Sequence, residues 1–429
     1  MRTRKIVGAS LASLLVLTGC SGSKGATASG TPDTSPLTIG AFNPFSGPDA
    51  SFGPEMMSGC FPAIDVINTA GGVLGHPLNC QEFDTRGDPA DAVPAANKMM
   101  ATTSNLVGIL GPSSDEALAT VPLLNTGNIP MFVDTGQAAF DQSSYKYFWR
   151  MTPADDIKGY AMALWAQKAG YTSAAAVFGN DVGSQSSLAT LVTAFGKLGG
   201  TMVSNQKVAL DQSSYRTEIT QMLATHPQVI FTEVDPQTAA TFLTEVKELN
   251  GGTLIPVIGT EVTLQAPWLK AVTGAITPAS VASSFVGLQP YAPTSGPAWE
   301  TFNTALLAEP KVPDASQWAS DPYSMTYYDA VVVMALAMTA AKSVDPTVWN
   351  DYVLKVTTAA TGATVVTSYA DGQAALAAGK QIQYIGAGGP IAFNQWHNST
   401  GAFEVAAYVN GKVKLVGSVS AADIAALSQ

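Results

Sequence analysis

The chain has 429 residues, of which 12% are charged, with 21 Lys and Arg against 32 Asp and Glu. A net charge of −11 without a basic patch argues against a nucleic-acid partner. The length predicts two or three domains, and an apolar content of 46% excludes global disorder. Three His and three Cys are too few for most metal clusters, so we expect neither a metal nor a cofactor.

The N-terminus has the pattern of a bacterial lipoprotein signal. A basic start and a short apolar stretch over 6–18 lead into the sequence LTGC at 17–20, which looks like a lipobox. We expect 1–19 to be a signal peptide, Cys20 to carry lipid, and 20–36 to form a flexible tether to the membrane. The alternative is an ordinary signal peptide with an incidental Cys.

Two further cysteines, Cys60 and Cys80, remain in the mature chain. Outside the cytoplasm two such thiols most often form one disulfide, here closing a loop of about 20 residues. The alternative is a pair of buried free thiols.

Strands and helices alternate through the first third of the chain. Asp88-Pro89 predicts a helix start, with Asp as N-cap and Pro in the first turn. The rhythm favours a parallel sheet with helices on both faces. The expected strands cover 37–41, 78–83, 107–110 and 131–133, and the expected helices cover 56–68, a segment from 88 onward, and 118–124.

A second α/β series begins after Arg150, which indicates two similar lobes. Its expected helices cover 155–168, 187–198, 215–224 and 236–249, and its strands cover 174–178, 203–208, 229–232 and 256–258. The last third differs, with helical stretches at 324–341 and 347–356 and a hairpin of 403–408 and 412–416 around Asn410-Gly411.

No catalytic constellation is visible. The sequence contains no nucleophile elbow, phosphate loop or HExxH motif. His76, His226 and His397 lie in separate loop contexts and are expected to be exposed turn residues. We therefore expect no enzymatic activity. An extracellular hydrolase, the alternative, would need a nucleophile–base pair or a metal cluster.

Polar loops follow the predicted parallel strands, which is where ligands bind in open α/β sheets. Hydroxyls and free N–H groups at a helix start suit a carboxylate, and an acidic side chain in the facing lobe suits an ammonium. For Ser113 and Asp134 the alternative is simple capping or turn chemistry. The loops cover 43–47, 51–53, 111–115, 134–137, 179–183 and 259–261.

Several segments, in order, resemble the branched-chain amino acid-binding (Leu/Ile/Val-binding) family of extracytoplasmic solute-binding proteins of ABC importers. They extend over almost the whole mature chain, and a lipid anchor and a Cys60–Cys80 pair also fit this family. The segments are PFSG (44–47), AIDVINTAGGVLG (63–75), DTRGDPADAVPAANKM (84–99), GILGPSS (108–114), FWRMTPADDIKG (148–159), YDA (328–330) and YIGAGGPIAFNQWHNSTG (384–401).

The resemblance implies a type I periplasmic-binding-protein fold: two doubly wound α/β lobes, three crossovers and a ligand cleft between the lobes. Lobe one would comprise 37–150 and 283–380, and lobe two 151–282 and 381–417. The remaining 418–429 would form a C-terminal tail.

The resemblance also implies roles for single residues. The loop with Ser113 and Ser114 would bind a ligand carboxylate, Gly136 and Gln137 would add a backbone N–H and a polar side chain, and Glu261 would pair with the α-ammonium. Phe52 would cover the ligand side chain, or alternatively pack between the lobes. Two features depart from the family pattern. The serine loop is shorter than usual and carries Asp115-Glu116, and Gln137 stands where the family has a small hydroxyl residue.

Two further cleft residues, Asp181 and Val182, complete the expected site, although Val182 replaces a frequent Tyr. We expect a lipid-anchored, monomeric receptor that binds a small zwitterion, an amino acid or related amide, and delivers it to ABC permease subunits. The acidity of Asp115, Glu116 and Asp181 would instead suit a basic or polar solute. The alternative function is a solute-sensing or surface-presented binding lipoprotein without a transport partner.

Overall fold

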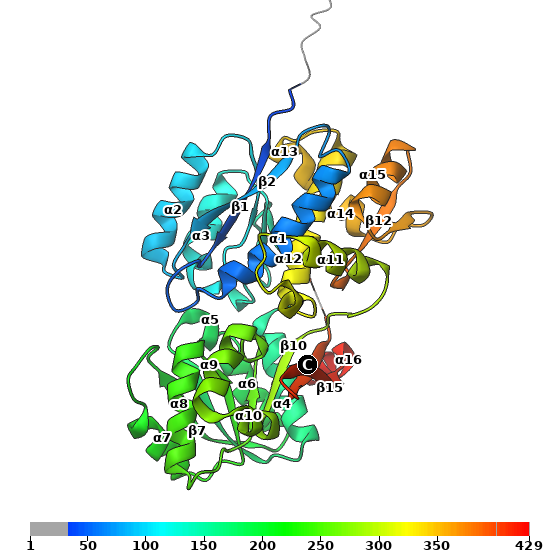
Figure 1. Ribbon diagram of the computed structural model, residues 1–429. Helices are drawn as coiled ribbons and strands as arrows, with labels where there is room; N and C mark the ends of the chain where they lie inside the picture. The colour runs from blue at the N-terminus through cyan, green and yellow to red at the C-terminus, as the bar shows by residue number, and fades with distance from the viewer. Residues whose placement is uncertain (1–32, 400, 429) are drawn as a thin grey trace, which may run out of the picture. The chain divides into compact units, whose positions relative to one another are not determined.

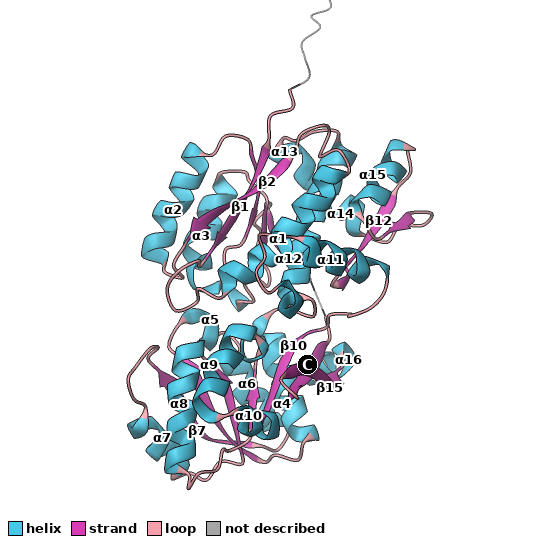
Figure 2. Cartoon of the chain, in the orientation of Figure 1, coloured by secondary structure: helices cyan, strands magenta, loops and turns pink. Residues whose placement is uncertain are grey.

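The structure is a computed structural model that describes residues 33–399 and 401–428 (Figure 1). The predicted signal peptide, the lipidation at Cys20 and nearly all of the predicted tether lie outside these residues. From Leu37 onward the chain forms two α/β lobes, each built on its own sheet with helices on both faces (Figure 2).

Lobe one is built on a five-stranded parallel sheet in the order β2-β1-β3-β4-β5. Helices α2 (Pro89–Thr102) and α3 (Ser114–Thr126) cover one face, and α1 (Phe52–Thr69) and α12 (Pro322–Ala341) cover the other. The strand order reverses between β1 and β3, which opens a crevice at the carboxyl ends of the strands. The strands are β1 (Leu37–Asn43), β2 (Leu78–Asp84), β3 (Leu106–Leu110), β4 (Met131–Val133) and β5 (Phe148–Arg150).

A later part of the chain completes lobe one. It adds a three-stranded sheet of β11 (Thr364–Val366), β12 (Ile382–Gly386) and β13 (Gly389–Pro390). It also adds short helices around α12: α11 (Pro297–Ala308), α13 (Pro346–Trp349), α14 (Val353–Thr357) and α15 (Tyr369–Ala377).

Lobe two is built on a seven-stranded mixed sheet in the order β15-β14-β10-β9-β8-β6-β7. The strands from β10 to β7 run parallel, and β14 and β15 form an antiparallel hairpin beside β10. The strands are β6 (Ser173–Gly179), β7 (Thr201–Val208), β8 (Val229–Glu233), β9 (Val257–Gly259), β10 (Phe285–Pro290), β14 (Phe403–Val409) and β15 (Lys412–Val419).

Helices cover both faces of this second sheet, with a separate apolar core under each. One face carries α4 (Asp155–Lys168), α6 (Leu188–Lys197) and α16 (Ala421–Ser428), and α5 (Val182–Gln185) precedes α6. The other carries α7 (Arg216–Leu223), α8 (Pro236–Leu249), α9 (Ala266–Ile276) and α10 (Pro278–Ser284).

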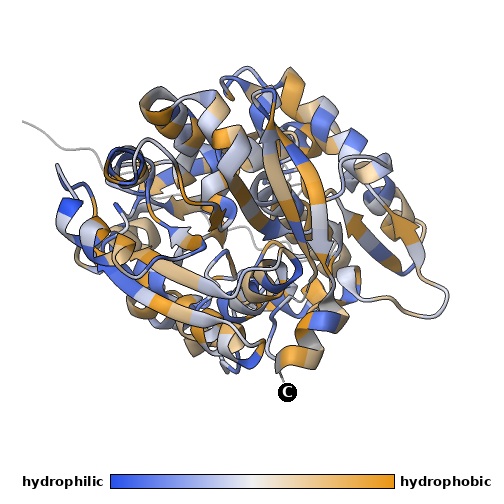
Figure 3. Cartoon of the chain, turned by 90° about the horizontal axis from the view of Figure 1, so that it is seen from below, coloured by the Kyte–Doolittle hydropathy of each residue, from blue (hydrophilic) through white to orange (hydrophobic). Residues whose placement is uncertain are grey.

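Hydrophobic and hydrophilic residues follow one another in bands along most helices and strands (Figure 3). Such banding is expected where an element buries one face only. Helix α12 is different, because 15 of its 20 residues are buried. Within the described ranges it is also the one helix long and apolar enough to span a membrane, and its burial identifies it as a core helix of lobe one.

An Asp-Pro pair begins four of the helices. The Asp side chain accepts a hydrogen bond from a backbone N–H of the first turn, and Pro occupies the first helical position, where no N–H is needed. The predicted cap Asp88 is confirmed, with Asp88 Oδ1 accepting from Ala90 N at 2.8 Å. The other three caps are Asp235, Asp321 and Asp345.

The fold class predicted from the sequence is confirmed, but three lobe boundaries differ from the prediction. The predicted change of lobe at 283 is wrong, because β10 pairs with β9 and β14 in the sheet of lobe two. The predicted return at 381 is also wrong, because Ile382 and Tyr384 of β12 pack into the core of lobe one. The expected tail at 418–429 instead continues β15 and forms α16, whose Ile424 packs into a core of lobe two.

Cys60 of α1 and Cys80 of β2 form a disulfide, with Cα atoms 6.5 Å apart. The bond ties the first helix to an edge strand of lobe one and closes a loop of 20 residues. We expect the double variant Cys60→Ala/Cys80→Ala to lose about 3 kcal/mol of unfolding free energy, because the unfolded chain regains that loop's freedom. Urea denaturation under non-reducing conditions measures the loss.

Reduced wild-type protein is the matched control, since it lacks the bond but keeps both sulfur atoms. It should lose nearly as much stability as the double variant. Equal stability of the oxidised and reduced wild type would contradict the prediction.

Candidate functional site

A cavity of about 70 Å³ lies between the lobes, where the carboxyl ends of the parallel strands of both sheets meet. Most of its lining follows β1, β3 and β4 in lobe one and β6, β8 and β9 in lobe two. Lys158 is the one basic side chain among the described lining residues. Nine lining side chains are carboxylates: Asp49, Glu55, Asp115, Asp134, Asp155, Asp181, Glu233, Asp235 and Glu261.

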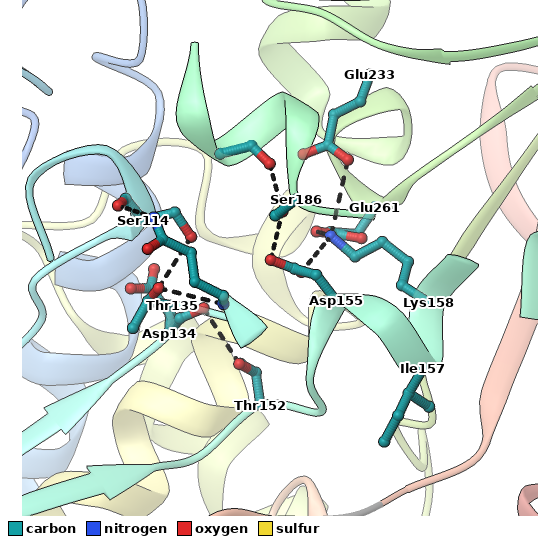
Figure 4. Close-up of polar contacts among 12 residues, drawn as sticks. Ser114, Asp134, Thr135, Thr152, Asp155, Ile157, Lys158, Ser186, Glu233 and Glu261 are labelled. Carbon is teal, nitrogen blue, oxygen red and sulfur yellow. Dashed lines mark hydrogen bonds and ion pairs between the residues drawn. The ribbon is translucent and has the colours of Figure 1, made fainter. Parts of the chain in front are cut away.

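Lys158 is surrounded by three carboxylates (Figure 4). Its Nζ lies 2.7 Å from Glu261 Oε1, 3.1 Å from Asp155 Oδ1 and 3.7 Å from Glu233 Oε2. Burial alone would lower the pKa of Lys158, but the three carboxylates outweigh it and raise that pKa well above its usual value. Lys158 is therefore a permanent positive charge inside the cavity wall.

The start of α4 brings two of these groups together. Asp155 and Lys158 are three residues apart and so lie on the same side of the helix. Gly136 O accepts a hydrogen bond from Asp155 N at 2.7 Å, and a Cβ atom on Gly136 would lie 2.2 Å from Asp155 Oδ1. Because Gly136 has no side chain, the Asp155 carboxylate can occupy this position.

A second acidic group, the aspartate cluster, consists of Asp49, Asp115, Asp181 and Asp235. Burial, together with the neighbouring aspartates, raises the pKa of Asp49 well above its usual value and the pKa of Asp115 to about 6. Asp49 and Asp115 therefore ionise less readily than exposed aspartates do.

The two lobes are in contact around the cavity. Phe52 of α1, for example, packs against the core of lobe two. Such contacts enclose the cavity as closure around a solute would. Hydrogen bonds also join the lobes across the cavity, among them Gly183 N to Asp115 Oδ1 at 2.7 Å, Gln265 Nε2 to Glu55 Oε1 at 2.8 Å, and Tyr323 OH to Glu261 Oε1 at 3.1 Å.

Several acceptor atoms of the lining have no hydrogen-bond partner within the described part of the chain. Four of them belong to side chains that are at least nine-tenths buried: Asp235 Oδ2, Glu261 Oε2, Gln265 Oε1 and Glu233 Oε2, the last of which lies 3.7 Å from Lys158 Nζ. Asp134 Oδ1 and Asp181 Oδ2 likewise have no hydrogen-bond partner among the described residues. Because a buried unpaired acceptor costs free energy, this set indicates a place for a ligand rich in donors.

Six residues predicted from the sequence line the cavity. Their contacts with a solute stay predictions. The six are Phe52, Ser113, Ser114, Asp115, Asp181 and Glu261.

The predicted role of Ser113 as a free donor is at odds with its contacts. Its Oγ and N–H donate to the two carboxylate oxygens of Glu116 at 2.9 and 3.3 Å. Glu116 is fully buried, and burial raises its pKa to about 8. The capping alternative for Ser113 therefore accounts for both of its hydrogen bonds.

Three predicted residues do not line the cavity. Gly136 packs against Asp155, as described above, and Val182 is 47% exposed at the start of α5. The Gln137 side chain donates to the backbone oxygen of Ser114, and the Gln137 backbone oxygen accepts from Arg150 Nη1 at 3.2 Å. Gly136 and Gln137 therefore contact the lining residues from outside the cavity and help to hold them in place.

Sequence reasoning missed most of the acidic lining. Asp155 and Lys158, in ADDIKG at 154–159, carried a usable signal, because opposite charges three residues apart at a helix start share a side. Glu233 and Asp235 also follow a predicted strand directly. Glu55, Gln265 and Tyr323 gave no local signal, since distant segments bring them to the cavity.

Comparison with known proteins agrees with this architecture. The Leu/Ile/Val-binding protein BraC3 of Rhizobium johnstonii is 33% identical over 103 residues, which is 24% of this chain and 28% of that protein. The leucine-, isoleucine-, valine-, threonine-, and alanine-binding protein of Pseudomonas aeruginosa is 30% identical over 123 residues, 29% of this chain and 33% of that one. The chain thus aligns with about a third or less of the length of these relatives.

Solved structures match over far more of the chain. A leucine-binding protein, LivK, from Thermotoga maritima has a TM-score of 0.70 at 18% identity, covering 90% of this chain and 99% of that one. A solute-binding protein from R. palustris in complex with benzoate also scores 0.70 at 18% identity, over 90% and 96%. The sequence profile of the periplasmic binding protein family matches residues 36–412, and the chain belongs to that family.

Proposed function

We propose that this protein is the solute receptor of an ABC importer, and that it holds a small ammonium-bearing solute between its lobes. The observation that carries the proposal is the interlobe cavity with its buried, unpartnered acceptors. The sequence-derived expectation of an amino acid or related amide falls within this class. The relatives are named for the binding of Leu, Ile and Val, and one structural neighbour holds benzoate, so family membership leaves the solute open.

Glu261 is the proposed partner of the solute ammonium. Its Oε1 already accepts from Lys158 and Tyr323, while its buried Oε2 has no partner among the described residues. An ammonium at Oε2 would complete the carboxylate's hydrogen bonds. Because Glu261 belongs to lobe two and Tyr323 to lobe one, a solute held there would favour the closed arrangement of the lobes.

We also propose that the receptor acts at the cell surface. A lipid on Cys20 would hold the receptor at the outer face of the membrane, and a permease would take the solute when the lobes open. We propose that the receptor acts as a monomer and performs no chemistry on the solute.

The first test is the melting temperature of protein starting at Ser21, alone and with each standard amino acid and simple amines. A bound solute at about 100 times its dissociation constant adds roughly 2.7 kcal/mol and should raise the melting temperature by several degrees. We expect Glu261→Gln to weaken binding of the solute found by about 10- to 150-fold, the loss of one hydrogen bond to a charged group.

The control is Glu404→Gln, which changes another buried glutamate of lobe two, outside the cavity lining and hydrogen-bonded by Gln289. This variant should bind the solute as wild type does. Equal affinity of Glu261→Gln and wild type would remove the assigned role of Glu261.

A further inference from the structure

Building on the proposed receptor function, we propose that the solute is a small diamine, with one ammonium at Glu261 and the second at the aspartate cluster. The cavity has acceptors at two places and few free donors. The experiments below separate this inference from the receptor function itself.

The charge of the lining favours a cationic solute. The lining contains nine carboxylates and, among its described residues, the single ammonium of Lys158. That ammonium is already shared by Asp155, Glu233 and Glu261. A neutral zwitterion would leave the net charge of the cavity unchanged, whereas a dication would compensate part of its negative charge.

The unpartnered acceptors lie at two separate places in the lining. Glu261 Oε2 and Gln265 Oε1 lie on the loop and the short 3-10 helix after β9, while Asp235 Oδ2 lies at the start of α8. All three side chains are at least nine-tenths buried and line the cavity. Each of these atoms can only accept a hydrogen bond when the carboxylates are ionised, so donors are needed at both places.

The start of α3, where an amino acid's carboxylate would bind, offers few donors. The start of α3 was expected to supply donors, but Ser113 gives its hydroxyl and its N–H to Glu116. The next residue, Ser114, stands beside Asp115 and near Asp181. A carboxylate placed there would meet like charges, whereas an ammonium would meet opposite ones.

The cavity of about 70 Å³ has room for several water-sized groups, which favours a short solute over a long polyamine. No set of three or more His, Cys, Asp or Glu in the described ranges is placed to hold a metal ion, so the donor set favours an organic cation.

The test compares three probes of equal chain length by isothermal titration: 1,4-diaminobutane, 1-aminobutane and 4-aminobutanoate. Each has four carbon atoms and one ammonium at the first end: the diamine carries a second ammonium on its fourth carbon, 1-aminobutane ends in a methyl group, and the fourth carbon of 4-aminobutanoate is a carboxylate. We expect the diamine to bind about 10- to 150-fold more tightly than either of the others. Leucine and magnesium chloride at matched ionic strength complete the set.

Asp235→Asn is the informative variant, because Asn keeps the Oδ1 that caps α8 through Gln237 N and Thr238 N and removes the charge. This variant should bind the diamine about tenfold or more weakly than wild type does, and it should bind 1-aminobutane with unchanged affinity. The control is Asp88→Asn. Asp88 also caps a 14-residue helix in an Asp-Pro pair, but at an exposed position outside the cavity, so this variant should change the affinity for neither probe.

Each outcome has a defined meaning. Binding of leucine or 4-aminobutanoate as tightly as the diamine would overturn the diamine inference and leave the receptor function standing. An equal response to magnesium would also overturn it, because the cavity would then respond to charge alone. A lack of binding by every amine and amino acid would overturn both the inference and the proposed ammonium-binding function.

Discussion

Lys158→Met is expected to lower the free energy of unfolding by about 3–5 kcal/mol near neutral pH. The side chain of Lys158 is 7% exposed, and its ammonium contacts three carboxylates that are 8–10% exposed. Methionine keeps most of the aliphatic volume but leaves those carboxylates without their cation. Removing one partner of a buried ion pair costs this much because the remaining charge stays buried.

The loss should depend on pH in a defined direction. Burial raises the pKa of Glu233 well above its usual value, and the Lys158 charge acts against that rise. Without Lys158 the pKa of Glu233 rises further. A carboxyl group whose pKa is higher in the folded than in the unfolded state lowers the free energy of unfolding as pH increases toward its folded-state pKa. The variant should therefore be close to wild type at pH 5 and most destabilised at pH 8, as measured by urea denaturation at each pH.

Lys146→Met is the matched control. Lys146 lies 3.2 Å from Asp351, but both side chains are more than half exposed. An exposed pair of this kind contributes about 0–1 kcal/mol, with little dependence on pH in this range. Equal losses in the two variants, or a Lys158→Met loss independent of pH, would contradict the assigned network.

The sequence predicted the repeating units of the fold well because local signals determine them. The Asp88 cap, the hairpin at Asn410-Gly411 and the span of α4 at 155–168 follow from residue type, spacing or short-range periodicity. Asn410 and Gly411 both have positive φ, as a two-residue hairpin turn requires. The resemblance to a known family then supplied the two-lobed arrangement.

The lobe boundaries could not be predicted in the same way. Strands β10 and β12 have similar short apolar patterns, yet β10 belongs to lobe two and β12 to lobe one. Pairing partners decide the lobe, and they lie far apart in the sequence. For the same reason Gln265 and Glu55, 210 residues apart, gave no joint signal before they met across the cavity.

The sequence could not decide between two possible uses of a single side chain. Ser113 matched the pattern of a ligand-binding serine, but three residues later Glu116 takes both of its hydrogen bonds. The alternative of a capping serine was correct on that point. His397 was likewise expected to be exposed, but it is half-buried against an indole ring. The His397 φ of 60° fits the expected turn, so the sequence missed only the contact of this residue with Trp149.

Trp149→Ala is expected to lower the free energy of unfolding by about 3–5 kcal/mol, the usual loss for a buried Trp. Trp149 is 2% exposed in β5, its ring stacks on His397 with centroids 3.8 Å apart, and its Nε1 donates to Asn350 Oδ1 at 2.9 Å. Alanine would remove the stacking and leave the Asn350 acceptor buried. The loss is measured by urea denaturation.

The position of Trp149 gives the loss a second consequence. The chain leaves lobe one directly after β5, and it returns to lobe two just beyond His397. Arg150 N donates to His397 O at 2.9 Å, so the ring and the backbone together hold two crossover segments side by side. We therefore expect faster amide hydrogen exchange at Arg150 in the variant. Trp299→Ala removes a half-buried Trp of α11 whose Nε1 donates to Ala319 O. It should lose less stability and leave Arg150 exchange unchanged, because that hydrogen bond does not involve the segments of Arg150 and His397. Equal exchange at Arg150 in both variants would show that Trp149 stabilises lobe one without holding the crossovers together.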